Sequence, residues 1–563
     1  MSSDKARRQR IVVVTGGAAG IGAAIAQAFG HSGAFVVTVD PVLSLDGSSR
    51  IADEGPTTAQ QIIDAGGTAR ASNLSVTDRE GVQTLFADLV EEFGALDTVV
   101  NVAGISRPTD FAAGSEEDWA AVIGVHLDGY LNVLGAALPI MVEAGHGRIL
   151  GVTSGSGWRP ANTGAYGCAK RAVAALTWQI GQATPAGVTV NALSPIALTR
   201  MITGARSSAA GGQSAADART GGLSLGAAPP PENLGPVGAY LGSEEFSWCR
   251  GQVIFSNGAE VALVTPPRLL EVCRTADVSA LPHALAAVFP IAIVPAEAGQ
   301  STNGGSTPRF GPVFDEPAPD SGATPSSALT CLVVTDDPAW GNAISAGLTS
   351  QGVSCVGLGA GDAAQPVSTE MAEGFAASQQ LAQAARDAGP FDAVVVVARQ
   401  GAGAEAPDDS WQQILDEHAG LAQKLLNDAG WARAVADHSA QADRPVSLVM
   451  VTDATSAGGR SRAQAVAQHA RSSHTATSDR VDAFAISVET VDENERRTVA
   501  DLVTHLVRSP DVAALSGAEL VVASGWFGLR SHPRPAATIS FGGPAIPGWL
   551  DAALRSVVNE SAG

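Results

Sequence analysis

The 563-residue sequence predicts an α/β protein built from two tandem doubly wound parallel sheets. Short apolar runs alternate with longer Ala/Leu-rich stretches, a pattern typical of buried parallel strands joined by helices. Four runs recur in the same order in the second half, which indicates two copies of one fold; two unrelated α/β domains are the alternative. The matching segments are residues 11–16 and 332–336, 96–104 and 391–399, 148–154 and 447–453, and 251–258 and 517–525.

A segment rich in Gly, Ser, Thr and Pro lies between the two copies and has no apolar period, so it is interpreted as a linker. The C-terminal tail carries aromatic residues among Pro and Gly, and we expect it to strap one half to the other or to reach a partner chain. The predicted division is a first domain over residues 1–298, a flexible linker over 299–327, a second domain over 328–530 and a tail over 531–563.

Composition excludes several classes of protein. The formal charge of −22 disfavours a nucleic-acid partner, because binding to a phosphate backbone needs clustered Lys and Arg. The five cysteines form no CxxC pair, which argues against a zinc site and against a disulfide framework. The chain shows no signal peptide and no apolar run of about eighteen residues, so we expect a cytoplasmic protein with no membrane partner and no metal.

A glycine-rich turn follows the first predicted strand. Gly16, Gly20 and Gly22 stand between that strand and the opening of a helix, with Ile21 among them. Glycines here let backbone amides approach a pyrophosphate at the positive end of the helix dipole. A tight turn that binds nothing is the alternative, but the position between strand and helix predicts a Rossmann-like dinucleotide site.

Asp40 ends the next predicted strand, eighteen residues beyond Gly22. A carboxylate at this place accepts hydrogen bonds from an adenosine ribose and repels a 2′-phosphate. The turn carries Ala18 and Ala19 and no cation, so we predict NAD rather than NADP as the cofactor. A polar residue that starts the Asp40-Pro41 turn is the simpler interpretation of this aspartate.

Tyr166 and Lys170 stand four residues apart in an apolar helical pattern, so both project from one helix face. The whole chain has only three tyrosines and three lysines, which makes a chance pairing improbable. An ammonium group near a phenol lowers the phenol's pKa, and we therefore expect Tyr166 to exchange a proton with a substrate oxygen.

Ser154 ends a predicted strand twelve residues before Tyr166. Its hydroxyl is placed to hydrogen-bond the same substrate oxygen and to stabilise developing charge. Ser156 is a rival for this role, and a serine that only caps the strand is the structural alternative.

Taken together, residues 11–258 resemble the short-chain dehydrogenase/reductase family. The resemblance is carried by the glycine turn, Asn101-VAG, Ser154, Tyr166-GCAK and Asn191-ALSPIALT. It implies that Tyr166 is the general acid/base, that Lys170 also binds the nicotinamide ribose, and that Ser154 positions the substrate. The cofactor-binding residues it implies are Gly16, Gly20, Ile21, Gly22, Asp40, Asn73, Leu74, Asn101, Ala103, Gly104, Tyr166, Lys170, Pro195 and Thr199.

The sequence departs from this family at two informative positions. Asn73 stands where the family usually has Asp, so the adenine contact is altered. His126 stands where the family usually has Asn, as in some members that act on 3-hydroxyacyl-CoA thioesters. We expect His126 to hold a proton-relay water and count it as a catalytic candidate; a buried structural histidine is the alternative.

The second half resembles the same family without its functional residues. Its glycine turn is replaced by a run containing Asp336, Asp337 and Pro338, whose charge and missing amide disfavour a pyrophosphate. Asp453 replaces the serine, and no tyrosine follows Tyr240. We therefore predict an inactive copy that takes the place of a neighbouring subunit, so that a homodimer imitates a tetramer.

The predicted function is hydride transfer between NAD and a secondary alcohol or ketone. A 3-hydroxyacyl or 3-oxoacyl thioester is the favoured small-molecule substrate, and a hydroxysteroid or other lipophilic alcohol is the alternative. A non-catalytic NAD-sensing scaffold is the alternative of another class. The loop between Thr199 and Pro231 is expected to form a lid. A thioester predicts that an arginine lies near the site, and the candidates are Arg107, Arg159, Arg200 and Arg206.

Overall fold

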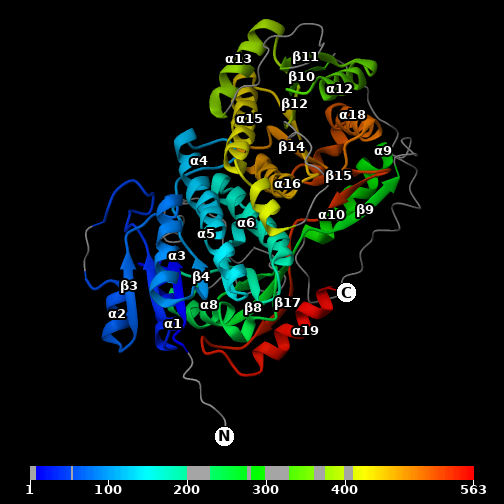
Figure 1. The fold of residues 1–563 in the computed structure, drawn as a ribbon. Coiled ribbons are helices and arrows are strands. Elements are labelled where there is room, and N and C mark those ends of the chain that lie inside the picture. Colours follow the sequence, from blue (N-terminus) through cyan, green and yellow to red (C-terminus); the bar gives the residue numbers. More distant parts are fainter. Residues whose placement is uncertain are drawn as a thin grey trace.

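Two sheets, one in each half of the molecule, organise the chain in the computed structural model (Figure 1). The structure describes residues 8–51, 55–199, 228–274, 281–297, 329–359, 374–398 and 410–562. The predicted linker at 299–327 and most of the predicted lid, including Arg200 and Arg206, lie outside these residues.

The first sheet has nine strands in the order β17-β8-β7-β6-β5-β4-β1-β2-β3. β1 to β7 run parallel, whereas β8 is antiparallel to β7 and β17 is antiparallel to β8. Its strands are β1 (Ile11–Thr15), β2 (Phe35–Val39), β3 (Thr68–Ser72), β4 (Thr98–Asn101), β5 (Gly147–Val152), β6 (Val188–Pro195), β7 (Val253–Ser256), β8 (Glu260–Thr265) and β17 (Arg534–Ser540).

The second sheet has eight strands in the order β11-β10-β12-β13-β14-β15-β16-β9. β10 to β15 run parallel, and β16 and β9 complete the sheet in antiparallel fashion. Its strands are β9 (Leu269–Arg274), β10 (Thr330–Thr335), β11 (Ser354–Gly359), β12 (Ala393–Val397), β13 (Val446–Asp453), β14 (Val481–Val488), β15 (Glu519–Ala523) and β16 (Trp526–Arg530).

Eight strands of the first sheet and the eight of the second follow one order, and only β3 lacks a counterpart among the described residues, which confirms the prediction of tandem doubly wound sheets. The neighbouring strands β5, β4 and β1 of the first sheet correspond to β13, β12 and β10 of the second, as the recurring sequence segments predicted. In each half the last parallel strand is followed by an antiparallel one, namely β7 by β8 and β15 by β16.

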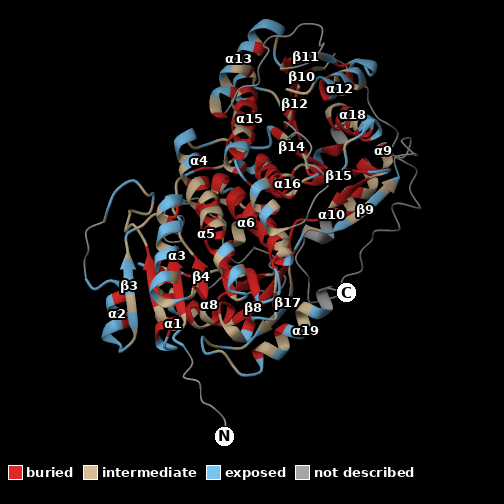
Figure 2. Ribbon diagram, viewed as in Figure 1, coloured by how far each residue is buried: buried red, intermediate tan, exposed pale blue. Residues whose placement is uncertain are grey.

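Helices cover the sheets, and their inward faces are buried (Figure 2). Those of the first half are α1 (Gly20–His31), α2 (Thr58–Asp64), α3 (Arg79–Phe93), α4 (Glu116–Ile123), α5 (Gly129–Glu143), α6 (Gly164–Ala183), α8 (Gly235–Leu241) and α19 (Leu550–Ala562). Those of the second half are α9 (Leu281–His283), α10 (Phe289–Glu297), α12 (Pro338–Ser350), α13 (Ala377–Ala388), α14 (Trp411–Glu417), α15 (Leu421–Ala442), α16 (Ala457–Ala470), α17 (Ser473–Thr477) and α18 (Glu493–Arg508).

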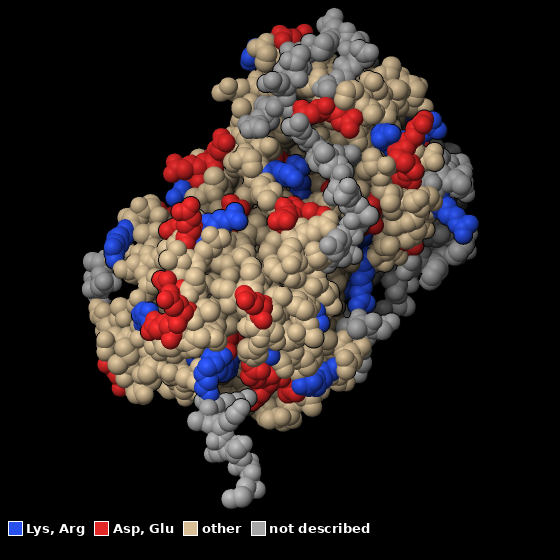
Figure 3. Space-filling view, in the orientation of Figure 1, with Lys and Arg blue, Asp and Glu red and all other residues tan. Residues whose placement is uncertain are grey.

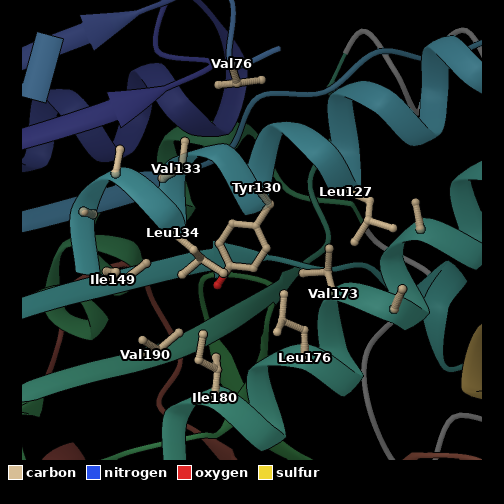
Figure 4. Close-up of a cluster of buried hydrophobic side chains, with 14 of the residues drawn as sticks. Val76, Leu127, Tyr130, Val133, Leu134, Ile149, Val173, Leu176, Ile180 and Val190 are labelled. Atoms are coloured by element: carbon tan, nitrogen blue, oxygen red, sulfur yellow. The ribbon is translucent and has the colours of Figure 1, made fainter. Parts of the chain in front are cut away.

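The core beneath the first half's helices α5 and α6 is apolar and closely packed. Figure 4 shows Tyr130 of α5 among aliphatic side chains from both helices and from β5 and β6, including Leu134, Leu176 and Ile149. A π-helical turn, Gly124–Asp128, joins α4 to α5. The resulting helical run Glu116–Glu143 is long and apolar enough to span a membrane by length and composition, yet many of its residues belong to this core.

The structure differs from the predicted division at two places. β9 lies within the predicted first domain but pairs with β16 of the second sheet, and the following helices pack through Leu285 and Phe289 into the second core. Conversely, β17 and α19 of the predicted tail join the first half, where β17 pairs with β8. The tail therefore straps the halves together, because each sheet is completed by a strand from across the boundary (Figure 1).

The connections that cross between the halves also contact each other. β8 leads to β9 and β16 leads to β17 through two short segments. Ser531 donates its amide to the carbonyl of Arg268 at 2.8 Å, and the Arg268 amide donates to Ser531 Oγ at 3.1 Å. The exchange of strands is thus reciprocal and is held by paired crossovers.

Candidate active site

The glycine turn after β1 has a backbone that only glycine adopts easily. Gly16 and Gly20 have φ of +65° and +58°, in the left-handed region. A Cβ on Gly22 would lie 2.1 Å from the carbonyl oxygen of Gly16. α1 begins here, and its N-cap residue Ala19 makes no side-chain capping hydrogen bond. The turn therefore fits the phosphates of a dinucleotide, because backbone amides at a helix start lie uncovered by any capping side chain.

Asp40 lies directly against this turn at the end of β2. Its Oδ2 accepts a hydrogen bond from the amide of Ala18 at 3.2 Å, and its Oδ1 accepts one from the amide of Val42 at 2.8 Å. The second bond belongs to the turn that follows the strand, as the simpler interpretation expected. The first bond fixes the carboxylate beside the glycine turn, where the cofactor interpretation requires it.

The ends of β3 and β4 supply the remaining adenosine-side candidates. Asn73 is exposed after β3, and Leu74 packs partly buried against the core. Asn101 is buried at the end of β4, where its Oδ1 accepts a hydrogen bond from Thr15 Oγ1 at 2.8 Å. Thr15 Oγ1 also accepts from the amide of Ala103 at 3.3 Å, so it ties β1 to the segment after β4.

Ser154, Tyr166 and Lys170 are brought together as predicted. Ser154 follows β5, and the other two lie on α6. The Ser154 side chain acts on the Tyr166 phenol and lowers its pKa. Lys170 Nζ lies 5.8 Å from the centre of the Tyr166 ring and donates to the carbonyl of Val152 at 2.6 Å.

The electrostatics of this pair differ from the expectation. Burial raises the pKa of Tyr166, and the Ser154 side chain opposes that rise only in part. Burial also lowers the pKa of Lys170 to about 7, which weakens the positive charge that was expected to stabilise a phenolate. Burial therefore sets the direction of both shifts, and Lys170 is not among the causes of the shift at Tyr166.

His126 lies beside Tyr166 in the π-helical turn. The two rings meet edge to face with centroids 5.0 Å apart. Nε2 of His126 is 2.8 Å from the carbonyl oxygen of Ile105, whereas Nδ1 is buried without a hydrogen-bond partner among the described residues. Burial and the charge of Lys170 lower its pKa well below the usual value, so the imidazole is neutral. A Cβ on Gly104 would lie 2.3 Å from this ring, which explains the glycine there.

The other predicted cofactor residues are Thr199, Pro195 and Ile21. Thr199 approaches the glycine turn, since a Cβ on Gly20 would lie 3.7 Å from Thr199 Cγ2. Pro195 ends β6 with partial exposure, and Ile21 packs against the first half's core. The structure thus brings the predicted residues to one edge of the first sheet.

Two features of the candidate site were not predicted from the sequence. Thr15 shows only as the last residue of an apolar strand, although its hydroxyl links Asn101 to the Ala103 amide. The segment Ser156–Arg159 after Ser154 contacts the second half, and no pattern in the sequence signals that contact. Among the described residues, no three His, Cys, Asp or Glu side chains gather in a way that could hold a metal.

Comparison with known proteins covers mainly the first half. Residues 10–209 match the family model described as short chain dehydrogenase. A short-chain type dehydrogenase/reductase of Mycobacterium tuberculosis is 38% identical over 200 residues, which cover 34% of this chain and 68% of that protein. The 3-oxoacyl-[acyl-carrier-protein] reductase FabG of Thermotoga maritima is 30% identical over 257 residues, covering 45% of this chain and 98% of FabG. Hydroxyacyl-CoA dehydrogenase ChsB1 of M. tuberculosis is 33% identical over 273 residues, covering 46% and 81%.

One solved structure matches both halves. The N-domain of a bacterial malonyl-CoA reductase, determined with NADP, covers 92% of this chain and 98% of that chain with a TM-score of 0.64. At 18% sequence identity the match shows the two-sheet fold alone. The family is shown instead by the relatives of the first half, the half that carries the glycine turn and the Ser154, Tyr166 and Lys170 cluster. The chain therefore belongs to the short-chain dehydrogenase/reductase family.

Proposed function

We propose that this protein interconverts a secondary alcohol and a ketone with NAD as its cofactor. Enzymes of the family are oxidoreductases that act on CH–OH groups with a nicotinamide cofactor. The observation that carries the proposal is the convergence of Ser154, Tyr166 and Lys170 at the sheet edge where the glycine turn lies.

The first half's own residues divide the work on the substrate oxygen. The hydroxyl of Ser154 hydrogen-bonds that oxygen and orients it toward Tyr166. Because burial raises its pKa, Tyr166 stays protonated near neutral pH, which is the form that donates a proton to a ketone oxygen. Lys170 holds a hydrogen bond to the Val152 carbonyl and carries the adjacent charge when protonated. When bound, the nicotinamide cofactor supplies or accepts the hydride at the substrate carbon.

NAD is favoured by the position of Asp40. Its carboxylate is fixed against the glycine turn by the Ala18 amide. A second negative charge on a ribose 2′-phosphate would be repelled there, whereas two ribose hydroxyls would donate to it. Measuring the ratio of NAD to NADP affinity in Asp40→Ala tests this; an unchanged ratio would contradict it.

A 3-hydroxyacyl or 3-oxoacyl thioester is the proposed substrate class. The names of two relatives, a 3-oxoacyl reductase and a hydroxyacyl-CoA dehydrogenase, support it. Arg107 is engaged by Glu117 and Asp118. Of the two candidates within the described residues, Arg159 remains: its side chain lies over Gly155, next to Ser154, and burial lowers its pKa. No carboxylate in the described part of the chain pairs with it, so it is suited to an anionic part of the substrate.

The second half is proposed to serve assembly rather than catalysis. α16 contains neither Tyr nor Lys, and it packs along the helix α6 that carries Tyr166. If the second half takes the place of a neighbouring subunit, a homodimer of this chain contains four such halves and imitates a tetramer, which is the assembly we propose. Sedimentation of the full chain as a stable monomer would contradict that arrangement.

Reduced-nicotinamide absorbance tests the proposed reaction. Acetoacetyl-CoA and a hydrophobic secondary alcohol panel are assayed with NAD(H), and Arg159→Met is compared with wild type. We expect turnover of the thioester and a rise in its KM in Arg159→Met. Turnover of lipophilic alcohols alone would replace the thioester, and NAD binding without turnover of any substrate would favour the sensing scaffold.

A further inference from the structure

The turn that follows Ser154 is held by the second half of the chain. Gln468 of α16, which is 2% exposed, donates from Nε2 to the carbonyl of Ser156 at 3.0 Å and to that of Arg159 at 2.8 Å. Arg471 donates from Nη1 to the carbonyl of Trp158 at 3.0 Å. Three carbonyls within four residues thus accept hydrogen bonds from the other half.

This clamp, formed by Gln468 and Arg471, holds the same turn that hydrogen-bonds to Ser154, since Gln468 binds the carbonyl of Ser156. The amide of Ser156 donates to Ser154 Oγ at 3.2 Å, and the amide of Gly157 donates to the Ser154 carbonyl at 2.9 Å. The Ser154 side chain in turn acts on the Tyr166 phenol, whose pKa it lowers. A displacement of the turn would therefore change the direction of the Ser154 hydroxyl.

The local sequence is shaped to admit this contact. A Cβ on Gly167 of α6 would lie 3.1 Å from the Ser156 carbonyl oxygen, and Gln468 Cγ lies 3.9 Å from that same position. Glycine at 167 thus lets the turn and α16 approach α6 together. On the opposite side, Arg171 is fully buried, donates to the Gly157 carbonyl at 3.2 Å and pairs with Gln464 of α16 at 2.7 Å.

We propose that Gln468 is a positioning residue for the active site of the first half. It fixes the turn after Ser154, and through that turn it sets the direction of the Ser154 hydroxyl toward Tyr166. The assignment rests on the proposed function for the roles of those two residues. It gives the second half a task beyond filling an interface, because the site takes its working geometry only when α16 is in place.

The Tyr166 phenol can be observed without any substrate. The chain has three tyrosines, so labelling with tyrosine carrying carbon-13 at Cζ gives three signals, which Tyr→Phe variants assign. The Cζ chemical shift responds to hydrogen bonds at the phenol. Ser154→Ala marks the position of the Tyr166 signal without its serine partner.

Gln468→Met keeps the side-chain length but removes the donor to both carbonyls. Gln179→Met is the matched control. Gln179 of α6 donates from Nε2 to Ser461 Oγ of α16 at 3.0 Å, so it also joins these two helices, but it does not contact the turn after Ser154. We expect Gln468→Met to move the Tyr166 signal toward its Ser154→Ala position and Gln179→Met to leave it unchanged. With acetoacetyl-CoA and NADH, Gln468→Met should lower kcat about tenfold while the KM for NADH changes less than about twofold.

A Tyr166 signal at the wild-type position in folded Gln468→Met would overturn the proposal, as would an equal shift in Gln179→Met. If Gln468→Met does not fold, Arg471→Met removes the neighbouring hydrogen bond to Trp158 and should move the same signal in the same direction; no movement there would also overturn it. Wild-type protein that turns over no thioester counts against the proposed substrate and leaves the signal comparison to decide on Gln468.

Discussion

The strand-to-helix turns of the two halves use the same position in the fold for opposite purposes. After β1, α1 starts at Gly20 with no capping side chain. After β10, α12 starts at Pro338, and the Asp337 carboxylate accepts hydrogen bonds from the amides of Ala339 and Trp340. One helix start is left open to an external anion, and the other is closed by an anion of its own. The difference teaches that an acidic cap occupies amides that a pyrophosphate would otherwise use.

The division of chemistry between the halves is tested most strongly at Tyr166. Tyr166→Phe should reduce turnover by about 10²–10⁴-fold, because it removes the group that exchanges the proton. NAD binding, followed by the fluorescence of the reduced cofactor, should persist. Tyr240→Phe is the control, because Tyr240 lies on α8 and donates its hydroxyl to Asp551, which is not part of the Ser154, Tyr166 and Lys170 cluster. Comparable loss in both variants would contradict the assignment.

Transferring the acidic cap to the first half is the next largest perturbation. Ala19→Asp should weaken NAD binding by about tenfold or more, because a carboxylate would compete with the pyrophosphate for the amides of α1. Ala19→Ser supplies a cap without charge and should weaken binding much less. Calorimetric titration measures both affinities and the stoichiometry, which we expect to be one NAD per chain. Equal affinities for the two variants would show that charge is not the deciding factor.

Lys170, which is buried, and Lys424, which is exposed on α15, compare the halves through pH. Burial lowers the pKa of Lys170 from 10.5 to about 7. Between those values the unfolded state binds more protons than the folded state, so the free energy of unfolding of the cofactor-free protein should rise with pH, by at most about 1.4 kcal/mol per pH unit. Lys170→Met should flatten this rise in urea denaturation between about pH 7 and about pH 9.

Lys424→Met is the control in the second half. The pKa of Lys424 is also lowered by burial, but the charges of Asp453 and Asp428 oppose the shift. Its removal should therefore change the pH dependence less. A larger effect at Lys424 than at Lys170 would reverse the comparison.

The smallest expected effect concerns the cap itself. Asp337→Ala should lower the free energy of unfolding by about 1 kcal/mol, since two amides of α12 lose their acceptor. It should leave NAD affinity unchanged, which calorimetry checks. Gain of a second bound NAD in this variant would mean that Asp337 alone keeps the second half from binding the cofactor.

The sequence predicted the parallel parts of both sheets and the residues of the cluster, because local patterns determine them. Strand runs, the glycine turn, and the four-residue spacing from Tyr166 to Lys170 are all properties of neighbouring residues. The distribution of charge over the surface does not follow from the sequence in this way. On the face drawn in Figure 3, acidic and basic side chains are interspersed, although the net charge is −22.

Features that depend on distant contacts were not predicted. The residues of β9 and β17 have strand-like composition, but their partners β16 and β8 lie hundreds of residues away. The pKa shifts of Tyr166 and Lys170 depend on burial, which sequence spacing does not reveal. Nothing in the sequence distinguishes Gln468 from the other polar residues of its helix, and only the fold shows that it contacts the Ser156 carbonyl.

The reciprocal exchange of β9 and β17 makes the whole chain the smallest unit that can fold completely. A fragment ending at the linker would carry a strand meant for the other sheet and would lack the one that completes its own. Such a fragment would expose the edges of β8 and β9, and unpaired edges invite aggregation. A protease cut within the linker would therefore leave the two pieces interlocked, because each would still pair a strand with the other's sheet.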